Sequence, residues 1–170
     1  VKDGLADLAM PQTQFAVIAE LRTAPSATGT YSYRLEFSAN PGQSMQDLAK
    51  VASGGERSRL MLVLKRFLAQ RQGLSTVLFD EIDTGVSGEI AIKMGEIMKE
   101  MSATMQVFAI THLPQIAAKG DTHYKVIKRI QNETTISELL VLNPEERIQQ
   151  IAEMLSGKDI SESALQHAKA

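Results

Sequence analysis

The sequence has no cysteine and no tryptophan, and only 5% of its 170 residues are aromatic. Without cysteine the chain can form neither disulfides nor a thiolate metal site, which agrees with a reducing compartment. It contains no apolar run of the roughly 20 residues that span a membrane, and no secretory signal segment. The net charge of −2 provides no overall basic field for nucleic acid. We therefore expect a cytoplasmic protein with no membrane partner.

What the chain does contain is the composition of an ordinary globular domain. With 44% hydrophobic residues over 170 positions, it is long enough to bury a core, and no internal repeat or low-complexity tract divides it. We expect one domain over residues 1–170. The chain starts at Val1 rather than at a methionine, and its first residues are typical of the interior of a longer protein, so we expect a fragment or a processed chain.

Periodicity and turn residues predict an α/β protein. Two nearly continuous apolar strands, residues 75–81 and 105–111, flank a helix capped by Ser87, which is the order of a βαβ unit with parallel strands. Strands of this kind are expected to be buried on both faces. The remaining predicted elements are antiparallel hairpins and helices: strands 15–21 with 31–37, strands 122–130 with 134–142, and helices from Ser53 to about Gln72, from Pro114, from Pro144 to Gly157, and over 161–169.

The long helix that begins at Ser53 has an unusual start. Ser53 and Glu56 have the S-x-x-E spacing of a capping box, in which each side chain bonds a free amide of the first turn. Gly54 and Gly55 need another reason, because a glycine inside a helix costs about 1 kcal/mol relative to alanine. One reason is that their amides, the Ser53 hydroxyl and the helix dipole receive a nucleotide's terminal phosphate. The other is close packing of the helix against a strand.

Polar side chains follow both predicted parallel strands. Asp80 and Glu81 come directly after the first strand, and Thr111 and His112 after the second. Ligands of open α/β sheets bind at the carboxyl ends of the strands. An Asp-Glu pair after an apolar strand has the Walker B form, in which the aspartate serves Mg²⁺ and the glutamate polarises the water that attacks a γ-phosphate. The alternatives are a solvated strand end and a structural histidine.

The sequence lacks the loop that grips the β- and γ-phosphates of a nucleotide. A P-loop reads G-x-x-x-x-G-K-[ST]. The only Gly-Lys pair, Gly157-Lys158, is followed by Asp159 and has no upstream glycine at the required spacing. The chain therefore has motifs that are expected to contact a nucleoside triphosphate, but it lacks the P-loop that binds the triphosphate.

Basic side chains gather on one predicted strand only. Lys125 and Arg129 share a face of this strand, whereas Lys128 lies on the opposite face. This pattern favours a solvated hairpin over a surface that binds nucleic-acid phosphates.

Four segments resemble, in order and spacing, the signature motif, Walker B, D-loop and switch histidine of ABC-type ATPases: SGGE (53–56), VLFDE (77–81), DTGVSG (83–88) and ITHLPQIA (110–117). Three more narrow the resemblance to the RecN family of SMC-like DNA repair proteins: EFSANPG (36–42), LAKVASGGE (48–56) and AEMLSG (152–157). The match covers nearly the whole chain.

The resemblance implies a divided ATPase head. Proteins of this family carry the P-loop, or Walker A, segment near the N-terminus, followed by a long coiled coil and a C-terminal segment like this chain. The two segments fold together as a P-loop NTPase head of ABC/SMC type, and two heads enclose two ATP molecules. Residues 1–170 would be the C-terminal part of such a head. That part would hold a parallel sheet core with flanking antiparallel strands and helices.

The start of the helix would then serve the nucleotide of a second head. The resemblance implies that Ser53, Gly54 and Gly55 contact the γ-phosphate held by the opposite head, while Glu56 holds the start of the helix. Arg57 departs from the family pattern, which has an apolar residue there, and it faces either solvent or the opposing head.

The strand ends would serve the nucleotide of the same head. The resemblance implies that Asp80 binds Mg²⁺ and that Glu81 is the base that activates water. Asp83, at the D-loop position, would cross the interface between heads, and His112 would sense the γ-phosphate.

The implied function is ATP hydrolysis in DNA double-strand break repair and recombination. The implied cofactors are ATP and Mg²⁺. The implied partners are the Walker A segment, a second copy in a head-to-head homodimer, and DNA ends or single-stranded DNA, with a nucleoid-associated location. We expect the chain to be inactive alone. Because the Walker A segment should cover part of the sheet, we also expect the isolated chain to expose apolar surface and to self-associate. The alternatives are the head of another SMC-like or ABC-type system and a nucleotide-independent dimerisation domain.

Overall fold

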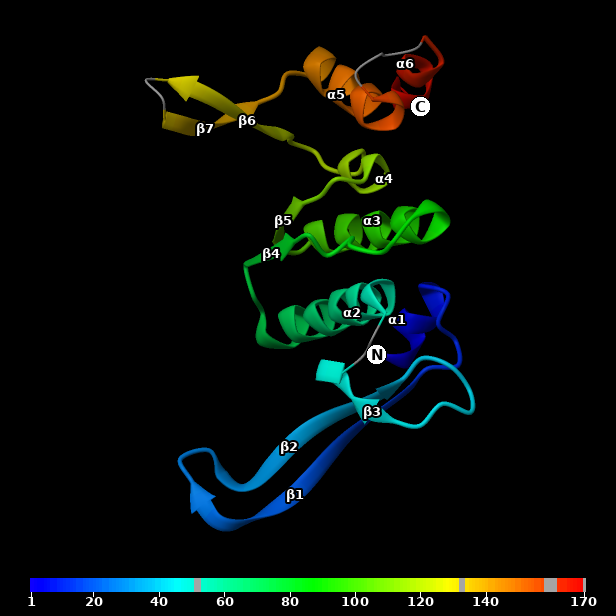
Figure 1. The fold of residues 1–170 in the computed structure, drawn as a ribbon, viewed down its shortest axis with the longest axis vertical. Helices are drawn as coiled ribbons and strands as arrows, with labels where there is room; N and C mark the ends of the chain where they lie inside the picture. Colours follow the sequence, from blue (N-terminus) through cyan, green and yellow to red (C-terminus); the bar gives the residue numbers. More distant parts are fainter. Residues whose placement is uncertain (51–52, 132–133, 158–161, 170) are drawn as a thin grey trace.

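The computed structural model describes residues 1–50, 53–131, 134–157 and 162–169. The chain forms an elongated molecule in which the elements are stacked roughly in sequence order (Figure 1). These elements are α1 (Lys2–Asp7), β1 (Gln14–Ser26), β2 (Gly29–Ser38), β3 (Gln46–Asp47), the 3-10 turn η1 (Leu48–Lys50), α2 (Gly54–Gln72), β4 (Thr76–Asp80), α3 (Gly88–Ser102), β5 (Gln106–Ile110), α4 (Pro114–Ala117), β6 (Tyr124–Gln131), β7 (Thr134–Val141), α5 (Pro144–Ser156) and α6 (Glu162–Lys169).

The strands of the described residues form three small sheets. The pair β4–β5 is parallel, whereas β1–β2–β3 and β6–β7 are antiparallel. This confirms the predicted α/β class and the predicted βαβ unit, with α3 connecting the parallel strands. The antiparallel hairpins make sheets of their own within the described residues, so they do not extend the edges of the parallel pair.

Helix α2 begins and ends where its capping residues predict. The Ser53 hydroxyl accepts a hydrogen bond from the Glu56 amide at 3.5 Å. Gly73 follows the last turn in the left-handed conformation, with φ 62° and ψ 38°, which a residue without a Cβ adopts at little cost. The helix thereby places its N-terminus beside the loop that follows β4.

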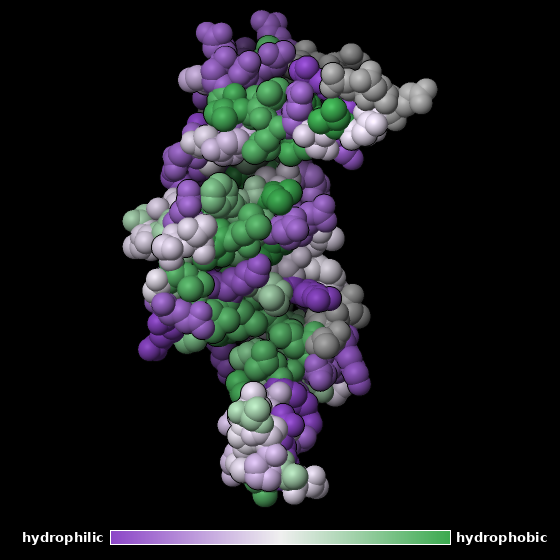
Figure 2. Space-filling view, turned by 90° about the vertical axis from the view of Figure 1, so that its left-hand side faces the viewer, coloured by the Kyte–Doolittle hydropathy of each residue, from purple (hydrophilic) through white to green (hydrophobic). Residues whose placement is uncertain are grey.

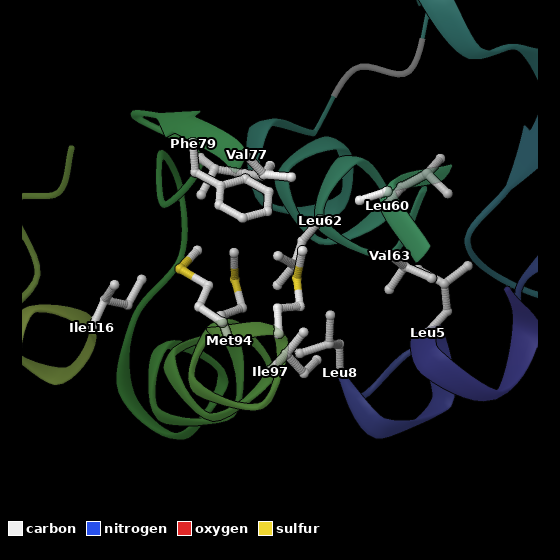
Figure 3. Close-up of a cluster of buried hydrophobic side chains, with 14 of the residues drawn as sticks. Leu5, Leu8, Leu60, Leu62, Val63, Val77, Phe79, Met94, Ile97 and Ile116 are labelled. Atoms are coloured by element: carbon white, nitrogen blue, oxygen red, sulfur yellow. The ribbon is translucent and has the colours of Figure 1, made fainter. Parts of the chain in front are cut away.

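The core lies between α1, α2, α3 and one face of β4 (Figure 3). Phe79 of β4 packs with its ring toward Met94 of α3 and Leu62 of α2, and all three side chains are fully buried. Leu5 of α1 and Leu8, which follows this helix, close the other end. Each such side chain contributes about 1.5–3 kcal/mol by leaving water. This packing fixes β4 and β5 relative to α2, and with them the strand ends.

The opposite face of the parallel pair is open, contrary to the prediction that both faces are buried. Leu78 of β4 lies beside Phe108 of β5, and these side chains are 55% and 42% exposed. Ile110, opposite Asp80, is 54% exposed. The physical reason is that the core elements of this chain cover only one side of a two-stranded sheet. Figure 2 shows the resulting hydrophobic surface along the side of the molecule that carries these strands.

Two N-terminal features depart from the prediction. Strand β1 runs past Leu21 to Ser26, and an irregular register between these residues accommodates Pro25, which lacks an N–H for the ladder. The short helix α1 has no strong local signal, and it is held by burial of Leu5 and Leu8 against the core.

The C-terminal elements agree with the prediction. Asn143 and Glu146 form a full capping box at the start of α5, and α6 follows as the last helix. The predicted turn at 132–133 and the predicted first residue of the last helix, at 161, lie outside the described residues. None of the described helices combines the length and the apolar character that a membrane crossing requires.

Candidate active site at the ends of the parallel strands

The register of β4 and β5 brings the predicted polar side chains to one edge of the sheet. Asp80 is paired with Ile110, and the Glu81 amide donates a hydrogen bond to the Ile110 carbonyl at 3.1 Å. The side chains of Asp80 and Glu81 are exposed there, and His112 follows two residues after Ile110. Because the side chains of residues two apart on a strand share a face, Asp80 lies on the open face together with Leu78. A group that covers this face therefore meets the Asp80 carboxylate.

Glu81 has an unusual backbone conformation. Its φ is +45°, in the left-handed region that costs a residue with a Cβ about 1–2 kcal/mol. Its carbonyl oxygen is fixed by Thr84, which donates from its hydroxyl at 2.9 Å and from its amide at 3.3 Å. Strained conformations of this kind concentrate at functional sites, where the surrounding structure holds them. The loop thus holds Glu81 beside the strand end with an exposed carboxylate.

Asp83 is turned inward, which differs from the implied role of a residue that crosses to a second head. The residue is fully buried within its own chain. One carboxylate oxygen, Oδ2, accepts hydrogen bonds from the Thr111 hydroxyl and, at 3.2 Å, from the His112 amide. The same oxygen lies 3.4 Å from His112 Nδ1. The physical reason for the difference is that the next strand end supplies its donors from inside the chain.

The two glycines at the start of α2 have different surroundings. A Cβ at Gly55 would lie 2.4 Å from the carbonyl oxygen of Gly85, which is shorter than real contacts allow. A Cβ at Gly54 would meet its nearest atom, the Thr84 carbonyl oxygen, at an ordinary 3.8 Å. Close backbone packing therefore explains Gly55, although the partner is the loop after β4 and not the predicted strand. Packing does not explain Gly54.

Ser58 connects α2 to the same loop, and no sequence pattern indicated this role. Its hydroxyl donates to the Thr84 carbonyl oxygen at 2.9 Å, and the residue is buried. Serine at an interior helix position is common, and its partner lies 26 residues away. The start of α2 and the loop after β4 are therefore one connected unit.

The exposed side of the α2 start is compatible with an anion. Ser53 and Gly54 are exposed, and Arg57 is exposed as well, which is compatible with both of its predicted surroundings. The first amides of a helix without intrahelical partners, together with the helix dipole, favour negative charge.

The described residues contain no group of three or more histidine, aspartate or glutamate side chains arranged to hold a metal ion. Asp80 offers an exposed carboxylate at the strand end, next to that of Glu81. This fits Mg²⁺, which in nucleotide sites takes one or two carboxylates and completes its shell with phosphates and water. A single protein carboxylate is therefore enough for the implied ion.

Two of the three basic side chains of β6 are paired within the chain. Lys125 forms an ion pair with Glu153 of α5 at 3.2 Å, and Arg129 forms one with Glu138 of β7 at 3.3 Å. These pairs favour the prediction of a solvated hairpin over that of a phosphate-binding surface.

Comparison with known proteins identifies relatives of the whole segment. No family model matches the chain. It is 39% identical over 173 residues to DNA repair protein RecN of Halalkalibacterium halodurans, a match that covers 99% of the chain and 31% of the relative. It is 41% identical over 165 residues to DNA repair protein RecN of Deinococcus radiodurans, with 97% and 29% covered. The RecN of Vibrio cholerae is 36% identical over 170 residues. The chain spans about 30% of the length of these relatives.

Solved structures of SMC heads share the fold. The Smc head domain of Pyrococcus yayanosii with its coiled coil and joint matches with a TM-score of 0.67 and 20% identity, over 91% of this chain and 28% of that one. A chain from work on the ATP-driven dimerization and DNA-stimulated activation of SMC ATPases matches with a TM-score of 0.62 and 19% identity, over 91% and 88%. At these identities the likeness concerns the fold.

Proposed function

The chain is homologous over nearly its whole length to a segment of proteins named DNA repair protein RecN, and from this premise we propose that it is the C-terminal part of an SMC-like ATPase head. In this proposal the chain binds and hydrolyses ATP only together with a Walker A segment and a second head. The activity serves ATP-dependent repair and recombination of broken DNA in the cytoplasm, at the nucleoid.

The observation that carries the proposal is the polar cluster at the strand ends. Asp80, Glu81 and His112 lie at the carboxyl ends of two parallel strands, where α/β sheets bind ligands. Glu81 is held there in a strained conformation. A solvated strand end of no function would have no need of this strain.

Each residue then has a role in phosphoryl transfer to water. When bound, Mg²⁺ supplies positive charge to the phosphates of ATP. Asp80 is the carboxylate that holds the ion. Glu81 accepts a proton from the attacking water, and His112 senses the γ-phosphate.

The start of α2 has the role of a phosphate cap for another head. Ser53 offers a hydroxyl, and Gly54 lets a phosphate approach its amide because it has no side chain. Glu56 gives its amide to the Ser53 hydroxyl and so helps to fix the first turn.

The partners follow from the relatives and from the open sheet face. The SMC ATPases with this fold are described by ATP-driven dimerization and DNA-stimulated activation. We extend both properties to this chain. Dimerization would join two heads in a head-to-head homodimer, and the whole protein would bind DNA ends or single-stranded DNA. The Walker A segment is the partner that would cover Leu78, Phe108 and Ile110 beside Asp80.

The first test measures steady-state ATP hydrolysis by the chain combined with a Walker A segment, with and without Glu81→Gln. We expect turnover in the combination, none by the chain alone, and loss of turnover in the variant while ATP-driven dimers persist, because only the base is removed. Glu100→Gln, in the last turn of α3, is the matched control, since Glu100 is paired with Arg66 of α2 at the opposite end of the helix from the loop after β4. Hydrolysis by Glu81→Gln at the parent rate would show that Glu81 is not the base.

The same preparations test the role of the α2 start. Ser53→Arg places a long side chain where the phosphate is expected, so dimers driven by ATP should fail to form. Association of the two segments that is indifferent to nucleotide, with or without this substitution, would favour a dimerisation domain instead.

A further inference from the structure

The proposed function assigns no role to the buried carboxylate of Asp83, which lies beside His112 in the candidate site. A carboxylate removed from water is costly unless hydrogen bonds and opposite charge compensate it. Asp83 is fully buried, yet its second oxygen, Oδ1, has no hydrogen-bond partner among the described residues. Incompletely satisfied buried groups in native proteins ask for a functional explanation.

The hydrogen bonds to Asp83 Oδ2 come from Thr111 and His112, the two residues that follow β5. The Thr111 hydroxyl and the His112 amide donate to this oxygen, and His112 Nδ1 lies 3.4 Å from it. The His112 ring is nevertheless 67% exposed. One nitrogen of the ring thus faces a fixed carboxylate while most of the ring remains accessible to a ligand.

The backbone on both sides of His112 is tied by the same group. The Thr111 hydroxyl, which donates to Asp83, also accepts a hydrogen bond from the Leu113 amide at 3.0 Å. Leu113 is the N-cap residue of α4, whose own side chain cannot cap the helix. Thr111 therefore links Asp83 to the start of α4, with His112 between the two tied positions.

The loop that carries Asp83 is itself held by the body of the chain. Ser58 donates to the Thr84 carbonyl oxygen, the Val86 amide donates to the Asp83 carbonyl oxygen at 3.1 Å, and Gly85 packs directly on Gly55. The Asp83 carboxylate is consequently held in place, so that it can orient the exposed ring of His112.

A carboxylate beside Nδ1 determines which form the imidazole takes. The neutral ring carries its proton on the nitrogen that has an acceptor, so the Nδ1–H form is favoured and Nε2 is directed to other partners. We propose that Asp83, assisted by Thr111, is a positioning residue that sets the orientation and tautomer of His112 from within the same chain. The expected effect of Asp83 on the rate of ATP hydrolysis rests on the proposed ATPase function, whereas its effect on the tautomer of His112 does not.

The structural arm of the test needs no nucleotide. Long-range ¹⁵N–¹H correlation spectra of the 170-residue chain identify the tautomer of each neutral histidine ring, and His112→Gln assigns the signal. We expect the Nδ1–H form in the parent chain and mainly the Nε2–H form in Asp83→Asn, because an amide can present its N–H to Nδ1. An unchanged His112 tautomer in Asp83→Asn overturns the proposal.

Thr111 provides a second pair of variants that preserves the fold if Asp83→Asn does not. Thr111→Val keeps the shape and removes the hydroxyl, whereas Thr111→Ser keeps the hydroxyl. We expect a mixed tautomer in Thr111→Val and recovery of the Nδ1–H form in Thr111→Ser. Thr104→Val, in the turn before β5, controls for the general effect of this exchange. Equal spectra for all three Thr111 side chains speak against the assistance of Thr111.

The kinetic arm uses the chain combined with its Walker A segment. Asp83→Asn should lower kcat by about 10- to 100-fold, the usual effect of losing the residue that orients a functional histidine. KM for ATP should change by less than about 3-fold, since the binding groups remain. Combined with Glu81→Gln, the variant should still form ATP-driven dimers.

The outcomes separate this proposal from the proposed function. Loss of ATP-driven dimers in Asp83→Asn would place Asp83 at the interface between heads and overturn the positioning role. A changed tautomer with an unchanged kcat would support the positioning of His112 by Asp83 and overturn its kinetic consequence. If even the parent combination does not hydrolyse ATP, the proposed function fails, and the spectra still decide whether Asp83 positions His112.

Discussion

Gly54 and Gly55 are adjacent in the sequence, but different physical causes act on them. Gly55 is needed by the chain itself, because the Gly85 carbonyl oxygen occupies the place of a side chain. Gly54 has space for a Cβ within the chain, so folding alone does not require glycine there. The sequence posed two explanations for the pair, phosphate approach and close packing. Close packing explains Gly55, and phosphate approach is the explanation that is left for Gly54.

Alanine substitutions separate these causes. Gly55→Ala should lower the free energy of unfolding by about 1–3 kcal/mol, because a backbone carbonyl must move to admit the methyl group. Gly54→Ala should leave stability unchanged or raise it by up to about 1 kcal/mol, through the helix propensity of alanine. Urea unfolding of the two variants and the parent chain measures the difference. Equal loss of stability in both would contradict the packing assigned to Gly55.

Gly54→Ala also has a consequence in the combined protein. If a phosphate approaches the Gly54 amide, the variant should fold normally and yet form fewer ATP-driven dimers than the parent.

At the scale of elements, local signals predicted what local physics determines. Capping residues predicted the bounds of α2 and α5 to within about a residue. The apolar pattern did the same for β4 and β5. Helix α1 could not be predicted, because burial of Leu5 and Leu8 against distant elements holds it. The candidate site follows the same division. Its strand-end positions were predictable, whereas the inward turn of Asp83 depends on donors that only the fold brings near.

The stability of the junction between α4, β6 and α5 should depend on pH because of His123. Burial, and secondly the positive charge of Arg147, lower the pKa of His123 below its ordinary value of 6.5. The folded chain therefore binds this proton less readily than the unfolded chain does. It follows that the stability contributed by the neutral ring is present above pH 6.5 and is lost as the pH falls through the lower folded pKa.

Urea midpoints between about pH 7.5 and pH 5 measure this dependence. We expect the midpoint of the parent chain to fall with pH, and His123→Gln to weaken that fall. His167→Gln, at an exposed position of α6, should keep the behaviour of the parent. An identical pH dependence in His123→Gln and the parent would exclude His123 as its source.

At the scale of the molecule, the open face of β4–β5 agrees with the expectation of exposed apolar surface in a chain without its Walker A segment. Continuous apolar strands predicted burial on both faces, and the prediction is wrong for this chain because nothing among its described residues covers Leu78, Phe108 and Ile110. Exposed apolar strand surface of this kind drives association. We expect the chain alone to self-associate through this face and the Walker A segment to suppress the association.

Two phenylalanines of equal exposure test this expectation. Phe108, on the open face, is 42% exposed, and Phe67, on α2, is 43% exposed. Phe108→Ser should shift sedimentation-velocity profiles of the concentrated chain toward the monomer, whereas Phe67→Ser should not. The same shift in both variants would mean that total exposed hydrophobic area, not this face, drives association.

The pairing of strands with their sequence neighbours also bears on how the chain acquires its structure. Every paired strand of the described residues is matched with a neighbour in sequence, and the widest of these pairings, between β4 and β5, closes over a single helix. Strand pairings of this short range can form early, because closing a short loop costs little entropy. As the chain leaves the ribosome, each layer can therefore form on the one before it. The open sheet face is then already in place as a template when a covering segment docks.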